Sequence, residues 1–320
     1  MTKPIVFMFS GQGSQYYLMG RQLYEQHPGF RRWMEQCDAA AAPMIQQNLS
    51  QLIYQPIDKN KEFDRLLYTN PALLCIQYSL TRVLLEMDIE PDYLIGYSLG
   101  EIAAAVVTGS LSLADGIRLS IDLAALLEQA SPLAGMLAIF ETPDIFSQFP
   151  ELFANVWLTG RNFSKNFVVT GLAEDIAQLQ RVLNQRKIIC QSLPVKYAFH
   201  TPLLDPLQSQ IQQLAQGIDF NDLNIPILSP VNGQWKVRMD AAELWRIIRQ
   251  PVNFADSIQN LLNTGDYVFV DVGPSGTLAA FVKYSLPSCA QSLALQTLNR
   301  FGKDLESLQN LKLALGGAIA

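Results

Sequence analysis

Histidine is the scarcest residue type in this chain of 320 residues, with two copies, and cysteine has only four. The cysteines form no C-x-x-C pair and lie far apart in the sequence. With so few histidines as well, the composition argues against a zinc site, and we expect no metal. The cysteines in apolar runs, Cys75 and Cys190, are interpreted as small buried hydrophobic residues.

Long apolar runs and a positive net charge are also absent. No apolar run approaches the ~18 residues that a membrane-spanning helix needs, and the stretch after Pro4 is too short for a signal peptide. We therefore expect no membrane partner and a cytoplasmic location. A net charge of −6 with a pI near 5.0 argues against nonspecific binding to nucleic acid.

The most informative motif is Gly96-Tyr97-Ser98-Leu99-Gly100. An apolar, strand-like run at 91–95 precedes it, and a helical pattern begins at Glu101. In this context a serine between two glycines is typical of a nucleophile on a strained strand-to-helix turn. The amide of the next residue, Leu99, then points at the oxygen of a bound carbonyl. The motif predicts acyl transfer through Ser98.

A serine hydroxyl needs a neighbouring base, and the chain has two histidines. His27 lies in a polar turn, Gln26-His27-Pro28-Gly29, where a solvated loop residue is expected. His200 follows a strand-like run at 188–195 and precedes a turn into a helix. A histidine in that place can face a cleft, so we predict His200 as the base; the other interpretation is a hydrogen-bonded structural imidazole.

The amino-terminal run Ile5–Phe9 predicts a buried strand that leaves into the glycine-rich segment 10–15. This segment lacks the Gly-Lys-Ser/Thr ending of a phosphate-binding P-loop and the spacing of a dinucleotide fingerprint. A loop that presents backbone N–H groups to an oxyanion fits better.

The motifs at 11–15, 96–101 and 198–204 together resemble, in order and spacing, the malonyl-CoA:acyl-carrier-protein transacylase family, which includes the acyltransferase domains of polyketide synthases. The resemblance implies that Ser98 is the nucleophile and His200 the general base and acid. It further implies an oxyanion hole from the amides of Gln12 and Leu99. A main-chain carbonyl at about Asn253 would orient the imidazole, and no catalytic aspartate is needed.

The chain departs from the family pattern at Leu123, where the family carries an arginine that binds the free carboxylate of malonyl groups. Arginine holds a carboxylate through a charge-assisted bidentate pair, whereas leucine offers only apolar contact. A buried carboxylate without a partner costs several kcal/mol. We therefore expect malonyl groups to bind poorly, unless Arg118 or Arg161 reaches the pocket.

Three other positions complete the expected substrate pocket. Tyr97 replaces the histidine that usually precedes the nucleophile, and Phe199 belongs to a hybrid of the family's specificity patterns. Asn162 matches a family position near the substrate, although a loop asparagine is also a common turn former.

The element pattern predicts an α/β fold. We expect an α/β-hydrolase-like catalytic domain made of residues 1–130 and 198–320. The order strand, helix, strand, strand, helix, strand at 131–197 is that of a ferredoxin-like unit, which predicts a small domain inserted into the core. The active site is expected in the cleft between the two domains.

Loss of the carboxylate clamp points to the branch that resembles the acyl hydrolases of trans-acyltransferase polyketide pathways. The sequence thus predicts a serine-dependent hydrolase acting on acyl-carrier-protein thioesters, with the acyl carrier protein as partner and no cofactor of its own. The alternative is a transacylase that loads malonyl or another acyl group, delivered on CoA, onto carrier proteins. A third interpretation is a non-catalytic scaffold that docks carrier protein.

Overall fold

The computed structural model describes residues 3–55 and 62–319, and its larger β-sheet has the strand order β11-β10-β1-β2-β7-β8. Neighbouring strands are parallel except for the pair β7 and β8, which is antiparallel. The strands are β1 (Ile5–Phe9), β2 (Tyr93–Gly96), β7 (Asp222–Ser229), β8 (Gln234–Arg238), β10 (Val268–Asp271) and β11 (Leu293–Gln296). A mostly parallel sheet of this kind belongs to an α/β fold, as predicted.

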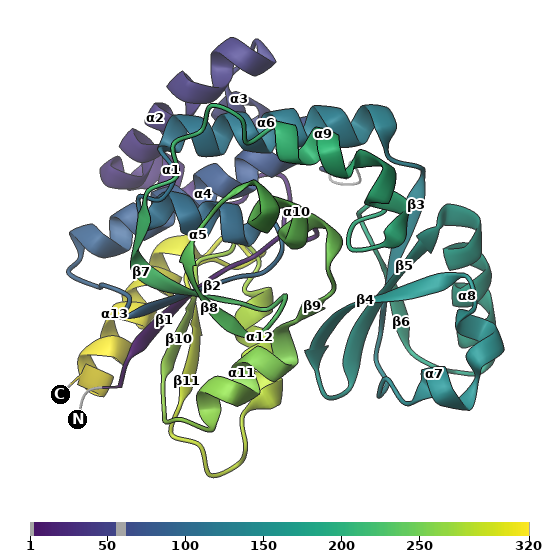
Figure 1. Cartoon of the computed structure of the whole chain (residues 1–320). Helices are drawn as coiled ribbons and strands as arrows, with labels where there is room; N and C mark the ends of the chain where they lie inside the picture. Colours follow the sequence, from purple (N-terminus) through teal and green to yellow (C-terminus); the bar gives the residue numbers. More distant parts are fainter. Residues whose placement is uncertain (1–2, 56–61, 320) are drawn as a thin grey trace.

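Helices surround this sheet and complete the larger unit of the molecule (Figure 1). They are α1 (Arg21–Gln26), α2 (Pro28–Ile45), α3 (Leu49–Tyr54), α4 (Leu66–Glu86), α5 (Gly100–Val107), α6 (Leu113–Ala130), the 3₁₀ helix η2 (Pro202–Leu207), α9 (Gln208–Gln213), α10 (Ala241–Arg249), α11 (Phe254–Leu262), α12 (Thr277–Ser285) and α13 (Asp304–Ile319). In the described part of the chain no helix has the length and apolarity needed to cross a membrane.

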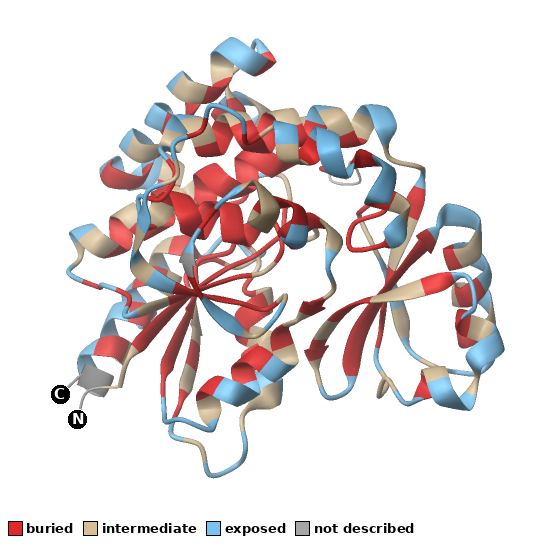
Figure 2. Ribbon diagram, in the orientation of Figure 1, coloured by how far each residue is buried: buried red, intermediate tan, exposed pale blue. Residues whose placement is uncertain are grey.

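Strand β1 contributes to two separate apolar cores, because successive side chains of a strand point to opposite faces of the sheet. Ile5, Phe7 and Phe9 pack into one core, which also contains residues of α2, α4 and α6. Val6 and Met8 pack into the other, with residues of α11 and α12. Figure 2 shows the central strands buried along their length. This burial on both faces explains why the strand reads as a continuous apolar run.

A second, smaller sheet has the order β6-β3-β5-β4-β9. Strands β3, β4, β5 and β6 and their helices follow one another in the order predicted for 131–197. Each of the pairs β3–β5, β3–β6 and β4–β5 is antiparallel. Its elements are β3 (Ala134–Ile139), α7 (Ile145–Gln148), the 3₁₀ helix η1 (Pro150–Phe153), β4 (Val156–Phe163), β5 (Asn166–Leu172), α8 (Ala173–Gln185) and β6 (Cys190–Leu193).

Strand β9 (Val252–Asn253) was not anticipated, and it comes from the larger unit. It pairs in parallel with β4 through Gly160 and Arg161, so the smaller sheet is completed by a segment outside the predicted range 131–197. A strand of two residues carries too short a pattern to be recognised in the sequence. The two units are therefore tied by backbone pairing as well as by their covalent connections (Figure 1).

Gly100 sits where the start of α5 touches β1. A Cβ at this position would lie 2.0 Å from the carbonyl oxygen of Phe9. We expect Gly100→Ala to lower the free energy of unfolding by about 2 kcal/mol or more, because the rigid backbone on both sides must move apart. Urea unfolding followed by circular dichroism measures this loss.

The matched control is Gly265→Ala, since no described atom lies within 4 Å of the added methyl group there. This substitution is expected to be neutral or slightly stabilising, because it only restricts the unfolded chain. Equal stability of the two variants would contradict the close approach of α5 to β1.

Candidate active site

The segment Gly96–Gly100 forms the sharp turn that the motif predicts. Strand β2 ends at Gly96 and α5 begins at Gly100. Between them Ser98 has a φ of 54°, in the left-handed region that residues with a Cβ rarely occupy. A Cβ on Gly96 would lie 2.4 Å from the backbone nitrogen of Glu101, so only glycine lets strand and helix come this close. The strained turn fixes Ser98 at the end of the strand.

Ser98 and His200 lie side by side although 102 residues separate them in the sequence. The Ser98 Oγ is 2.8 Å from the His200 Nε2, and both residues are buried. His200 also has a positive φ, 63°, and its backbone N–H donates to the Ile248 carbonyl at 2.9 Å. The backbone of α10 thus holds the turn that presents the imidazole, and the structure brings the predicted serine and histidine within hydrogen-bond distance.

The other imidazole nitrogen identifies the tautomer. His200 Nδ1 is 2.7 Å from the Gln250 carbonyl oxygen. A carbonyl can only accept, so Nδ1 must carry the hydrogen. In a neutral ring Nε2 then has the free lone pair, and it accepts the Ser98 hydroxyl proton. This arrangement activates a serine without a carboxylate.

The expectation that Asn253 orients the imidazole was wrong. The carbonyl of Asn253 accepts from Ser257 Oγ at 3.0 Å, and its N–H donates to Pro230 at 2.8 Å. The accepting carbonyl belongs to Gln250, which caps the C-terminus of α10. A helix end leaves carbonyls free for such a bond, whereas Asn253 lies beyond it and starts α11.

Burial lowers the pKa of His200 from its ordinary 6.5 to about 4, with Arg249 adding to the shift and the Gln250 bond opposing it. We expect the rate of Ser98 phosphonylation by a fluorophosphonate, in which fluoride leaves, to fall only as pH drops through about 4, when Nε2 takes a proton. The stability that neutral His200 contributes is complete above pH 6.5 and lost as pH falls to about 4. Rapid-quench labelling across pH measures the midpoint, and a midpoint near 6.5 would contradict a buried base.

The glycine-rich segment 10–15 approaches the serine turn closely. A Cβ on Gly11 would lie 2.6 Å from the Tyr97 carbonyl and 3.5 Å from the Leu99 nitrogen. The Gln12 side chain is anchored on α4, where its Nε2 donates to Thr69 Oγ1 at 2.8 Å and to Asn70 Oδ1. In the described part of the chain, neither the backbone N–H of Gln12 nor that of Leu99 donates a hydrogen bond to another backbone group of a turn, loop or cap. Both amides are therefore free to bind an oxyanion.

A cavity of about 1030 Å³ opens beside Tyr97 and Gln12 and lies between the two units of the molecule. The larger unit lines it with the segment 10–18 and with α12, and the smaller unit lines it with side chains of its sheet. The smaller unit contributes Met136, Ala138, Phe140, Asn162, Asn166, Val168, Gln191, Ser192 and Leu193. Of these, Asn162 was predicted from the sequence as a pocket residue and the others were not. The lining mixes apolar side chains with about as many polar and charged ones. A concave site between two units, with polar groups that can orient a ligand, is typical of a substrate site.

Tyr97 and Asn162 meet across this cavity, as their shared place in the expected pocket requires. The Tyr97 hydroxyl donates to Asn162 Oδ1 at 2.8 Å, and the Asn162 amide donates to Asn166 Oδ1 at 2.6 Å. A Cβ on Gly160 would lie 2.7 Å from that hydroxyl, so a glycine makes room for it. Burial raises the pKa of Tyr97 well above its ordinary value, so the hydroxyl keeps its proton and acts as a donor.

Leu123 and Phe199, two residues of the expected pocket, lie outside the lining of the cavity. Both are buried in the apolar core that also contains Leu99, and neither is among the described residues that line the cavity. Arg118, considered as a replacement clamp, pairs with two aspartates of its own helix, Asp115 at 3.2 Å and Asp122 at 4.0 Å. Of the described arginines, Arg300 alone lines the cavity, and Arg161 does not.

Within residues 3–55 and 62–319, no three or more histidine, cysteine or carboxylate side chains lie together so that they could hold a metal ion. The acceptor of the Nδ1 proton, Gln250, escaped sequence analysis because a backbone carbonyl has no sequence signature.

Solved structures of acyltransferases share this fold. The loading acyltransferase of the avermectin modular polyketide synthase superimposes with a TM-score of 0.88 at 28% identity, covering 97% of this chain and 99% of that one. The enzyme described as MCAT from Streptococcus pneumoniae gives a TM-score of 0.78 at 27% identity over 97% and 99% of the two chains.

Two Bacillus proteins match over nearly their full length. This chain is 37% identical to the polyketide biosynthesis acyltransferase homolog PksD of Bacillus subtilis, over 98% of the chain and 97% of that protein. It is 34% identical to the homolog BaeD of Bacillus velezensis, with the same coverage. The family described as acyl transferase domain matches residues 6–317. With the serine turn, the histidine and the fold in agreement, the chain belongs to the acyl transferase domain family.

Proposed function

We propose that this protein is a serine-dependent hydrolase that removes acyl groups from acyl-carrier-protein thioesters in polyketide biosynthesis. The observation that carries the proposal is Leu123, a fully buried leucine in the apolar core that also contains Leu99 and Phe199, the chain neighbours of Ser98 and His200. An uncharged acyl group is compatible with such surroundings, whereas a malonyl carboxylate would lose its hydration without gaining a partner. Arg118, the arginine nearest to Leu123 along the chain, is already paired with aspartates of its own helix.

The reaction begins with attack of Ser98 Oγ on the thioester carbonyl carbon, while His200 Nε2 takes the hydroxyl proton. The developing oxyanion accepts from the amides of Gln12 and Leu99. The carbon–sulfur bond then breaks, and the imidazolium gives its proton to the leaving pantetheine sulfur. Water attacks the Ser98 ester with His200 as base, the ester bond breaks, and Ser98 regains its proton as the free acid leaves.

The cavity supports a substrate that arrives on a long arm. Its lining comes from both units, and two cationic residues, Lys196 and Arg300, take part in it. A phosphopantetheine arm of an acyl carrier protein carries a phosphate that such cations attract. We further infer that the larger unit is a hydrolase-like core and that residues 131–197 form a ferredoxin-like insert. The phosphopantetheine arm would then lie between these two domains.

Transfer to a second carrier protein is the alternative outcome of the same acyl-enzyme, because a thiol in place of water gives a new thioester. The two Bacillus relatives are named acyltransferase homologs, and this name supports transfer as the alternative reaction.

The test uses carrier protein charged separately with acetyl and malonyl groups, with and without an uncharged acceptor carrier. Mass spectrometry follows both proteins. We expect loss of acetyl as free acid without acceptor, and slow loss of malonyl. Mass gain on the acceptor, above all by malonyl, would overturn the proposal in favour of a loading transacylase.

Substitution of Leu123 by arginine is expected to change the acyl specificity. In Leu123→Arg we expect the ratio of malonyl to acetyl turnover to rise by about tenfold or more, because the guanidinium pairs with the malonyl carboxylate. The variant is also expected to be less stable without substrate, since it buries an unpaired charge. Initial rates with both charged carriers measure the ratio.

Leu123→Met is the control, because it keeps a similar volume without charge. It should leave the ratio unchanged. An unchanged ratio in Leu123→Arg as well, in folded protein, would show that position 123 does not contact the acyl group.

A further inference from the structure

We propose that a buried charge cluster, made of Glu101, Lys236 and Glu243, positions both Ser98 and His200. The inference rests on the Ser98–His200 pair of the proposed function. The three added residues are positioning residues, which act through the backbone and do not contact the reacting atoms.

The three charged side chains of the cluster lie close together and have little contact with solvent. The Lys236 ammonium lies 2.6 Å from Glu101 Oε2 and 2.7 Å from Glu243 Oε2, and the side chains of Lys236 and Glu101 are 5% and 0% exposed. Ser229 Oγ donates to the other Glu101 oxygen at 3.0 Å. Glu243 is also paired with Arg246 at the protein surface. The Lys236 ammonium and the Glu101 carboxylate have lost nearly all their water, so their pairing must hold a favourable geometry to offset the cost of burial.

One end of the cluster fixes the serine turn. Glu101 is the second residue of α5, and its backbone N–H donates to the Ser98 carbonyl at 2.9 Å. Its Cα and N press against Gly96 on the other side of the turn. A shift of the Glu101 side chain is therefore transmitted directly to the backbone that carries Ser98.

The other end fixes the histidine. Glu243 lies in the first turn of α10. At the opposite end of this short helix, the Ile248 carbonyl accepts the His200 backbone N–H, and the Gln250 carbonyl accepts Nδ1–H. The Lys236 ammonium therefore joins the helix of the nucleophile to the helix that sets the tautomer and orientation of the base.

Stability alone does not explain a charged cluster here. Packed apolar side chains of similar volume would stabilise the same junction equally well or better, because charges are costly to bury. Burial raises the pKa of Glu101, while Lys236 and Ser229 act against this shift and favour the ionised form. Ion pairs specify distance and direction more sharply than apolar contacts, which suits a junction between two reacting side chains.

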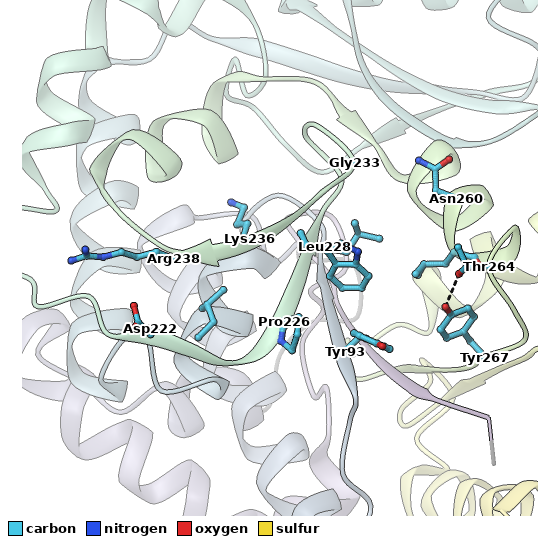
Figure 3. Close-up of a pocket in the computed structure, with 13 residues that line it drawn as sticks. Tyr93, Asp222, Pro226, Leu228, Gly233, Lys236, Arg238, Asn260, Thr264 and Tyr267 are labelled. Carbon is cyan, nitrogen blue, oxygen red and sulfur yellow. Dashed lines mark hydrogen bonds between the residues drawn. The ribbon is translucent and has the colours of Figure 1, made fainter. Parts of the chain in front are cut away.

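Lys236 reaches the cluster from the edge strand β8. Its stem lines a second cavity, of about 910 Å³, together with Tyr93 and Tyr267. Figure 3 shows Lys236, Arg238 and Asp222 on one side of this cavity and Asn260, Thr264 and Tyr267 on the other. The stem is thus accessible to substitution without rebuilding the core that surrounds Glu101.

The experiment measures the rate constant for labelling of Ser98 by a fluorophosphonate, which needs no carrier protein or acyl acceptor. For Lys236→Met we expect this rate constant to fall by about 10- to 100-fold, since small misplacements of a reacting pair cost that much. The reagent concentration at half-saturation should stay within about twofold, because the reagent does not contact the cluster. Glu243→Gln, which is partly exposed and keeps the Glu101–Lys236 pair, is expected to show a smaller fall in the same rate constant.

The double variant Glu101→Gln/Lys236→Met separates positioning from stability. It removes both buried charges, so its stability should recover relative to Lys236→Met, because no unpaired carboxylate is left buried. Its rate constant should stay low, because the link between α5 and α10 is still missing. Lys165→Met, an exposed lysine in the turn between β4 and β5, is the surface control. Unchanged labelling rates in folded Lys236→Met and Glu243→Gln, even with a lowered melting temperature, would overturn the inference. Absence of labelling in the wild type would instead refute the proposed function.

Discussion

Replacement of Ser98 by alanine is expected to lower kcat for release of acyl groups from carrier protein by roughly 10³- to 10⁶-fold, the range seen when a serine nucleophile is removed. Without Oγ, no acyl-enzyme forms, and His200 Nε2 loses the hydroxyl that lies 2.8 Å away. The remaining amides of Gln12 and Leu99 still polarise a bound carbonyl, so a small residual rate is expected. Intact-protein mass spectrometry should detect the acyl adduct in the wild type and none in Ser98→Ala.

The same variant distinguishes an enzyme from a docking scaffold. Carrier-protein affinity, measured by isothermal titration, is expected to be unchanged, because Ser98 is buried and removal of one oxygen leaves the surface intact. Ser147→Ala, at an exposed position of α7, is the control for a serine substitution without effect. Full turnover by Ser98→Ala would refute the serine mechanism.

Replacement of His200 by alanine is expected to lower the rate of acyl-enzyme formation by roughly 10³-fold or more, because the base and the nucleophile act as a unit. For the same reason the double variant Ser98→Ala/His200→Ala should be no slower than Ser98→Ala alone. Single-turnover measurements with acyl carrier protein give both rates.

The second histidine of the chain supplies a matched control. The His27 ring accepts from the Phe30 backbone N–H at 3.1 Å and caps α2. His27→Ala should therefore cost about 1 kcal/mol of stability, as the loss of a helix cap usually does, and leave the rate unchanged. If His27→Ala slowed the chemistry as much as His200→Ala, the assignment of the base would be wrong.

The reacting pair was predictable from the sequence because its geometry depends on local chemistry. Gly96 and Gly100 are required where the strand meets the helix, and only two histidines were available to choose from. The orienting carbonyl was not predictable, since every residue has one and its direction depends on where α10 ends. Asn253 lies only three residues from Gln250, yet its carbonyl serves α11 instead.

Helix boundaries show the same limit. The pattern predicts a helix from Pro71 to Met87, with proline in the first turn, whereas α4 begins at Leu66 and contains Pro71 in its interior. Packing of a long buried helix outweighs the local preference of proline for the first turn. The pattern was correct about the existence of the helix and wrong about its start, because tertiary contacts decide where a helix begins.

The insertion of the smaller sheet between the two reacting residues has a consequence for the diversification of this enzyme. Ser98 precedes the insert and His200 follows it, while side chains of the insert line one wall of the cavity. Exchange of 134–193 between related chains would alter the acyl groups accepted and leave the chemistry untouched. The exchange must preserve the edge of β4, because β9 of the recipient pairs with this edge. Strand β9 begins two residues after Gln250, whose carbonyl holds the His200 ring.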